Sequence, residues 1–259
     1  MTAHGTANTG KWLIPYTTCE QPAFRVVCFP HAGGSASYYP WLRPAVPSGA
    51  ELLCVQYPGR LERRREAPIV RFEEMTEAVL DVLSALPPRP LVLFGHSMGS
   101  LIAFETARGL ERRGSEVLGL IVSGRRAPSV RPPDRAGRDV GFAETIAETR
   151  ALGGIDPALL RDPEVLELIL PVLRADYRLS ETYRPEPGGT VSCPMTVLTG
   201  DADPRVDRAE AEVWSVHTTG DFVLHEVAGG HFFFNEDRST VLEHVRNALA
   251  ALHPSPVRS

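Results

Sequence analysis

The sequence predicts an α/β fold, with a mostly parallel central sheet flanked by helices and one helical insertion. Three observations support this class. Short apolar runs alternate with segments of helical periodicity along most of the chain. One such run, Leu91–Phe94, leads directly into a Gly-x-Ser-x-Gly turn that is followed by a helical pattern. After Gly124 the alternation stops, and helical patterns prevail until Met195.

The individual elements follow from local patterns. Apolar, β-branched runs bounded by Gly and Pro predict strands over 11–15, 24–30, 52–57, 91–94, 117–123, 195–199 and 222–227. Apolar residues repeating at three and four predict helices over 71–86, 142–152, 163–183, 208–217 and 236–252, besides the one that ends at Gly114. Asp162 and Pro163 supply the cap and first residue of the helix over 163–183, and Pro171 is expected to kink or split it.

This order divides the chain into a core and an insertion. Residues 11–137 and 185–253 are expected to form the sheet with its helices, and residues 138–184 a mobile helical lid over the carboxyl edge of the strands. Residues 1–10 are expected to be a disordered tail, and residues 254–259 a second tail.

Composition and charge argue against several classes of protein. With 259 residues, 43% hydrophobic and 23% charged, the chain suits a soluble globular domain with a sizeable core. A net charge of −5 gives no support for nucleic-acid binding, and no apolar run is long enough to span a membrane. The N-terminus lacks a signal peptide, so we expect a cytoplasmic protein. The four cysteines are scattered, which favours reduced thiols over disulfides or a zinc site.

The turn after Leu91–Phe94 reads Gly95-His96-Ser97-Met98-Gly99. Its glycines let the backbone double back, which exposes the Ser97 hydroxyl at the carboxyl edge of the sheet. The following helix places backbone N–H groups and its positive end beside that hydroxyl. This strand–turn–helix context predicts a nucleophilic serine on an α/β-hydrolase fold.

A nucleophilic serine needs a base and an orienting carboxylate, which follow it in chain order in this fold. His231 is the base we favour, because it lies in the loop after the last strand, whereas His217 falls on a predicted surface helix and His225 inside a strand. Two carboxylates follow the strand over 195–199. Asp203 is favoured over Asp201, which is better placed to stabilise the turn.

Two backbone N–H groups are expected to form the oxyanion hole. They belong to Met98, directly after the nucleophile, and to Ala32, in the loop after the strand over 24–30. Gly33 and Gly34 allow the backbone to approach closely there. His96, beside the nucleophile, is expected to pack under the turn. Neither a metal nor an organic cofactor is expected.

Five segments together resemble the type II thioesterases of polyketide and nonribosomal peptide synthases. They are FPHAGG (29–34), YPGRLERRREAP (57–68), GHSMGSLIAFE (95–105), LTGDADPRV (198–206) and GGHFFF (229–234). The resemblance covers nearly the whole chain and places Ser97, Asp203 and His231 on the triad and Ala32 and Met98 on the oxyanion donors. Ser100 stands where the family usually has Ala.

The resemblance implies an editing enzyme that hydrolyses stalled or mis-primed acyl groups from the phosphopantetheine arm of acyl or peptidyl carrier proteins, and small-molecule acyl thioesters. That arm belongs to the substrate, so no cofactor is needed. Three alternatives stay open: a small-ester or lipid hydrolase on the same fold, a macrocyclising thioesterase cut from a synthase, and a non-catalytic binding protein on a hydrolase scaffold.

Two further groups of residues are candidates for specificity. Acyl contacts are expected from the predicted lid, at Leu152, Leu159, Leu166 and Ile169. Carrier docking is expected from one of two arginine clusters, Arg60 with Arg63, Arg64 and Arg65, or Arg125 with Arg126 and Arg131. Arg60 is a special case, because its place in Pro-Gly-Arg suggests a buried structural pairing.

Overall fold

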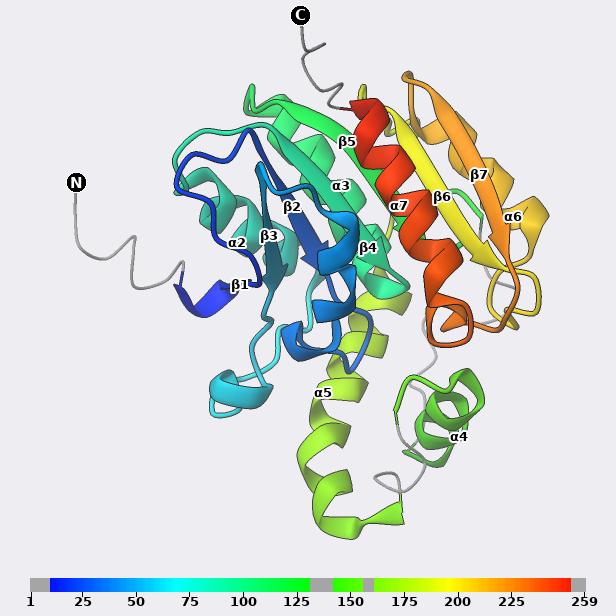
Figure 1. Ribbon diagram of the computed structural model, residues 1–259. Helices are drawn as coiled ribbons and strands as arrows, with labels where there is room; N and C mark the ends of the chain where they lie inside the picture. Colours follow the sequence, from blue (N-terminus) through cyan, green and yellow to red (C-terminus); the bar gives the residue numbers. More distant parts are fainter. Residues whose placement is uncertain (1–9, 131–141, 156–160, 253–259) are drawn as a thin grey trace, which may run out of the picture.

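A computed structural model describes residues 10–130, 142–155 and 161–252. Within these ranges the chain forms one seven-stranded sheet in the order β1-β3-β2-β4-β5-β6-β7 (Figure 1). Only β1 is antiparallel to its neighbour. The strands are β1 Leu13–Pro15, β2 Phe24–Phe29, β3 Ala50–Val55, β4 Leu91–His96, β5 Val117–Ser123, β6 Met195–Gly200 and β7 Phe222–Val227.

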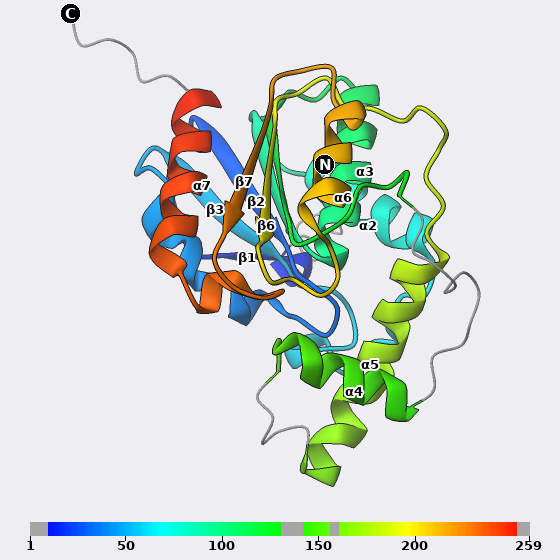
Figure 2. The ribbon, with the colours of Figure 1, turned by 90° about the vertical axis from the view of Figure 1, so that its right-hand side faces the viewer.

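Helices cover both faces of the sheet. They are α2 Phe72–Ser84, α3 Met98–Arg112, α4 Phe142–Leu152, α5 Pro163–Thr182, α6 Arg208–Glu212 and α7 Arg238–Leu252, joined by short 3₁₀ turns. In Figure 2 the sheet is seen edge-on, with α2, α3 and α6 on one side and α7 on the other. Every residue of β2 and β4 is buried, as expected for central strands of a parallel sheet covered on both faces.

Within the described residues, each predicted strand and helix is present in the predicted order, with small shifts. Residues 10–12 belong to a helical turn, so β1 begins at Leu13 and not at Lys11. Pro171 does not split α5, which continues as one helix on both sides of it. Val172 and Leu173, which follow it, are buried and hold this part of the helix in place. The helix predicted over 208–217 is α6 followed by a 3₁₀ turn, Val213–His217.

The helices of the predicted lid extend beyond the two helical layers, although α5 also packs against α2 and α3. α4 and α5 are placed beyond the carboxyl ends of the strands, and both views show them below the sheet (Figures 1 and 2). Residues 1–9, 131–141, 156–160 and 253–259 are outside the described ranges, so the boundaries proposed for the tails and the lid stay predictions. Among the described residues, no helix combines the length and apolar character needed to cross a bilayer.

Candidate active site

Ser97 lies in a sharp turn between β4 and α3 and has a strained backbone. Its φ of 54° and ψ of −119° are unusual for a residue with a side chain. The turn is tight enough to require glycine on both sides. A Cβ at Gly95 would lie 2.4 Å from the Gly99 carbonyl oxygen, and one at Gly99 would lie 2.0 Å from the Phe29 carbonyl oxygen. The motif glycines are therefore a steric requirement of this turn.

Ser100 is buried in the first turn of α3 and holds the Ser97 turn against β5. Its single hydroxyl proton is shared between the Gly95 carbonyl oxygen at 2.9 Å and the Ser123 carbonyl oxygen at 3.0 Å. The hydroxyl oxygen also accepts from the Ser123 N–H at 3.2 Å. An alanine would leave these contacts unmade. The departure from the family pattern at this position therefore adds hydrogen bonds under the turn.

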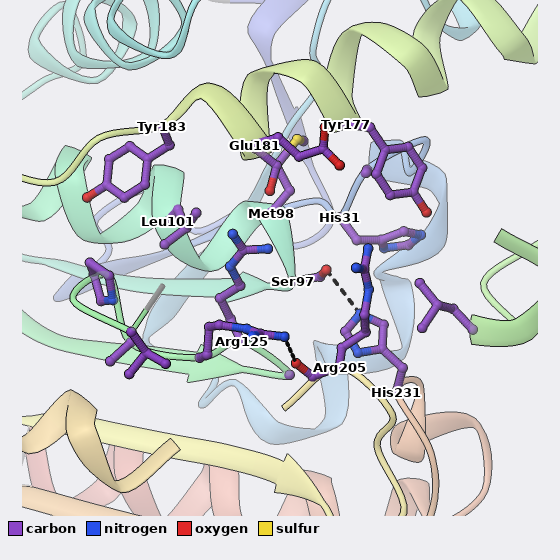
Figure 3. Close-up of a pocket in the computed structure, with 18 of the residues that line it drawn as sticks. His31, Ser97, Met98, Leu101, Arg125, Tyr177, Glu181, Tyr183, Arg205 and His231 are labelled. Carbon is purple, nitrogen blue, oxygen red and sulfur yellow. Dashed lines mark hydrogen bonds between the residues drawn. The ribbon is translucent and has the colours of Figure 1, made fainter. Parts of the chain in front are cut away.

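Three side chains predicted from separate parts of the sequence meet at the carboxyl edge of the sheet. His231 Nε2 lies 3.0 Å from Ser97 Oγ, and His231 Nδ1 lies 2.8 Å from Asp203 Oδ2. The other Asp203 oxygen accepts from the Arg205 N–H at 2.8 Å. Asp201 is exposed and accepts from the Gly229 N–H at 2.8 Å, which supports the loop before His231. Figure 3 shows the Ser97–His231 contact at the cavity wall.

Two more histidines surround the Ser97 turn, and both are buried. Burial lowers the pKa of His31 to about 3, with further lowering by His231 and Arg60. Burial also holds the pKa of His96 well below its usual value, helped by the neighbouring His231 and His31. His31 and His96 are therefore neutral at neutral pH. As predicted, His96 packs under the turn, with Nδ1 2.9 Å from Ser123 Oγ.

The remaining histidines considered as bases lie elsewhere. His217 is buried in the 3₁₀ turn after α6, with Nε2 2.8 Å from Ser129 Oγ, so the expected surface position is wrong. Its burial follows from packing against Phe104 and Trp214. His225 stacks on His244, with ring centroids 3.9 Å apart. Neither has a hydrogen bond to Ser97 among the described contacts.

The predicted oxyanion donors both line the cavity in front of Ser97. Met98 is the first residue of α3, so its N–H has no partner in the preceding turn of the helix. Ala32 lies in a turn closed by the Gly34 N–H, which donates to the His31 carbonyl oxygen at 2.9 Å. In the described part of the chain, neither the Met98 nor the Ala32 N–H donates to a protein acceptor. Both groups are available to a ligand.

The cavity has a volume of about 470 Å³ and lies between the Ser97 turn and α5. The apolar part of the cavity wall includes Leu101, Val130, Ile155 and Phe232. Polar residues of α5 and of the chain just after it also line the cavity, namely Tyr177, Ser180, Glu181 and Tyr183. Figure 3 shows Tyr177 and Glu181 above Ser97. The sequence analysis missed these polar residues, because helical periodicity marks only the apolar face of a helix.

Of the lid residues predicted to contact the acyl chain, one lies at the cavity and two do not. Leu152 lines the cavity. Leu166 and Ile169 do not; they pack with Ile146 and Leu170 in a small apolar cluster between α4 and α5. Leu159 lies outside the described residues.

Two arginines of the first cluster form internal ion pairs. Arg60 pairs with the buried Asp176, which confirms the expected structural pairing, and Arg63 pairs with Glu66 at 2.6 Å. Only Arg64 and Arg65 of that cluster are exposed.

In the second cluster, Arg126 pairs with Glu210 at 3.0 Å. Arg125 lines the cavity, where burial lowers its pKa to about 9, with Arg205 and Arg126 adding to the effect. Arg131 lies outside the described residues. Arg125 and Arg126 therefore form part of the cavity wall, and not an exposed docking surface.

Comparison with known proteins agrees with this geometry. Residues 24–249 match the thioesterase domain family. The chain is 43% identical over 255 residues to the probable cadicidin biosynthesis thioesterase of Streptomyces griseus, covering 98% of this chain and 68% of that protein. It is 41% identical over 254 residues to thioesterase PikA5 of Streptomyces venezuelae, covering 96% and 89%. The solved structure of the type II thioesterase BorB from the borrelidin cluster has a TM-score of 0.80 at 42% identity, covering 91% of this chain and 98% of that one.

The chain therefore belongs to the thioesterase family, and within it to the type II thioesterases of polyketide and nonribosomal peptide biosynthesis. It is accordingly a hydrolase with the α/β-hydrolase fold, as the sequence predicted.

Proposed function

We propose that the protein is an editing thioesterase, which hydrolyses acyl groups from the phosphopantetheine arm of acyl or peptidyl carrier proteins. The observation that carries the proposal is the hydrogen-bonded series Ser97–His231–Asp203, located at the wall of a partly apolar cavity. A nucleophile beside an apolar cavity suits an acyl thioester, whose chain needs burial while its carbonyl reaches the serine.

In the proposed mechanism, His231 takes the proton of the Ser97 hydroxyl through Nε2 as Oγ attacks the thioester carbonyl. Asp203 holds the imidazole through Nδ1 and stabilises the imidazolium that forms. The oxyanion accepts from the Ala32 and Met98 N–H groups, each worth about 3 kcal/mol in such sites. The pantetheine thiol leaves with the proton from His231, and water activated by His231 then releases the acid. These steps need no cofactor of the protein.

The test compares one preparation on three substrates with the same acyl group: acyl-carrier protein, acyl-pantetheine thioester and nitrophenyl ester. We expect the highest kcat/KM for the acyl-carrier protein. Equal or higher kcat/KM for the nitrophenyl ester would favour the alternative of a small-ester hydrolase. No turnover of any substrate by a folded preparation would favour a binding protein.

A further inference from the structure

Asp176 on α5 is fully buried and connects three segments that are far apart in the sequence. Its Oδ2 atom accepts from the Gly33 N–H at 2.8 Å and from the guanidinium of Arg60. Gly33 belongs to the loop after β2, and Arg60 to the loop after β3. The mechanism above uses neither Asp176 nor Arg60.

The Asp176–Arg60 ion pair has features that cost folding free energy, which points to a specific role. Both side chains are buried, at 6% and 0% exposure, and Asp176 Oδ1 and Arg60 Nε have no hydrogen-bond partner among the described groups. Buried ion pairs contribute little net stability compared with apolar residues of similar size. The loop that turns Arg60 inward is also strained, because exposed Leu61 has a φ of 48°.

The group that Asp176 holds is adjacent to the proposed oxyanion donor. Gly33, with a φ of 74°, is the third residue of the turn closed between His31 and Gly34, so its N–H belongs to the central peptide of that turn. That peptide begins at the Ala32 carbonyl, so its orientation restricts the ψ angle of Ala32, and the Ala32 N–H lies one peptide earlier in the same closed turn. The loop also lies directly against α5, since a Cβ at Gly33 would come within 2.4 Å of Leu173.

We propose that Asp176 is a positioning residue: with its charge held by Arg60, it fixes the Gly33 N–H and thereby aims the Ala32 N–H at the oxyanion. This inference rests on the proposed thioesterase function of the site. Tyr177 and Glu181 line the cavity and follow Asp176 on the same helix. An acyl chain that displaces α5 therefore also displaces the carboxylate that holds the turn over residues 31–34, here called the oxyanion loop. This contact couples acyl binding to catalysis.

The test uses two double variants that both remove the buried charges. Asp176→Asn/Arg60→Met keeps an oxygen that accepts from the Gly33 N–H, whereas Asp176→Leu/Arg60→Met does not. We expect the Asn variant to keep kcat on acyl-pantetheine thioester within about fivefold of wild type. The Leu variant should lose about 30- to 100-fold in kcat with KM nearly unchanged, because a misplaced donor affects the transition state more than substrate binding. Binding of an alkyl trifluoromethyl ketone should weaken by a similar factor.

Equal kcat for the two folded double variants would overturn the proposal, since the acceptor would then not matter. The proposed function fails separately, if wild-type protein hydrolyses no acyl thioester. A matched control is Arg25→Met/Glu51→Leu, which removes a mostly buried ion pair of 2.8 Å between β2 and β3. It should lower the melting temperature and leave kcat unchanged.

A second test uses wild-type protein and therefore does not depend on the folding of a variant. In ¹⁵N-labelled protein, covalent reaction of Ser97 with the trifluoromethyl ketone should shift the amide signals of Ala32 and Gly33 together with the Arg60 Nε signal. Unchanged Gly33 and Arg60 signals, with Ala32 shifted, would contradict the coupling between the oxyanion loop and Asp176.

Discussion

The Ser97 turn and helix α5 face one another across the same cavity, but they are held in different ways. The turn is fixed locally, by glycines that no larger residue can replace and by a β4 strand with every residue buried. α5 packs Leu170 in the small cluster with α4 and Leu179 in the main core, and it leaves Leu168 69% exposed. The reacting groups thus occupy the more rigid wall, which is built on a fully buried strand, whereas only seven of the 20 residues of α5 are buried.

The largest effect expected on the rigid wall comes from Ser97→Ala. This variant should fold normally and lose at least about 10⁴-fold in kcat, because the nucleophile is gone. It should also stop reacting with a fluorophosphonate probe. The matched control is Ser100→Ala, which removes the hydroxyl under the turn at a cost of about 1 kcal/mol in stability but should still label. Labelling of the Ser97→Ala variant would show that another residue is the nucleophile.

The second prediction separates the two aspartates that follow β6. Asp203→Asn should lower kcat by about 10⁴-fold, because the His231 imidazole loses the partner that sets its orientation and charge. Asp201→Asn should act mainly on stability, by about 1 kcal/mol, since among the described contacts Asp201 accepts from the Gly229 N–H and not from His231. Steady-state kinetics and thermal melts of both variants give the comparison. The reverse order of kcat losses would assign the acid to Asp201.

The rigid wall was predictable from sequence because its causes are local. A strand, a Gly-x-Ser-x-Gly turn and a helix are adjacent in the chain. The fold rule for chain order, together with the position of each candidate after its strand, led to His231 and Asp203. The contacts of Asp176 were not predictable, because no sequence motif or chain-order rule connects it with Gly33 and Arg60, which lie 143 and 116 residues away. Leu166 and Ile169 were misassigned for a similar reason: α5 packs on both α4 and the cavity, and apolar periodicity does not distinguish the two.

Leu152, the last residue of α4, tests whether the predicted lid controls acyl-chain preference. Leu152→Ala should change the ratio of kcat/KM for an eight-carbon against a two-carbon acyl-pantetheine by about tenfold, because the added space is used only by the longer chain. Leu166→Ala is the matched control, because Leu166 packs in the α4–α5 cluster and should affect only the melting temperature. A uniform loss of kcat/KM over both chain lengths would contradict a role of Leu152 in selection.

The two buried histidines beside the Ser97 turn predict that the free energy of unfolding falls at acidic pH. The pKa of His31 is lowered to about 3 in the folded protein, and that of His96 also lies well below its usual value. The unfolded chain, with pKa values of about 6.5, therefore binds more protons, and stability is lost as the pH falls below 6.5. Urea unfolding at pH 7, 6 and 5 should show a loss approaching about 1.4 kcal/mol per pH unit for each histidine. His96→Gln should reduce that slope, and an unfolding free energy independent of pH would contradict the assignment.

The smallest expected effect concerns the docking of a carrier protein beside α5. Carrier proteins are typically acidic around the serine that bears the arm, so docking should use exposed positive charge near the cavity. Arg60 and Arg63 are committed to internal pairs, which leaves Arg64 and Arg65 as the exposed members of their cluster. Their loop packs against α5, since a Cβ at Gly59 would lie 3.3 Å from Val172. The two arginines are therefore placed to meet an acidic partner at that helix.

Electrostatic docking predicts that rising salt lowers kcat/KM for acyl-carrier protein, largely through the association rate, while kcat/KM for acyl-pantetheine stays nearly constant. The variant Arg64→Glu/Arg65→Glu should reduce the carrier value several-fold at low salt and leave the small substrate unaffected. The control Arg43→Glu/Arg246→Glu makes the same change in net charge at exposed positions on and beside α7. A similar loss in both variants would mean that overall charge, and not this loop, attracts the carrier. No loss in either would exclude Arg64 and Arg65 from docking.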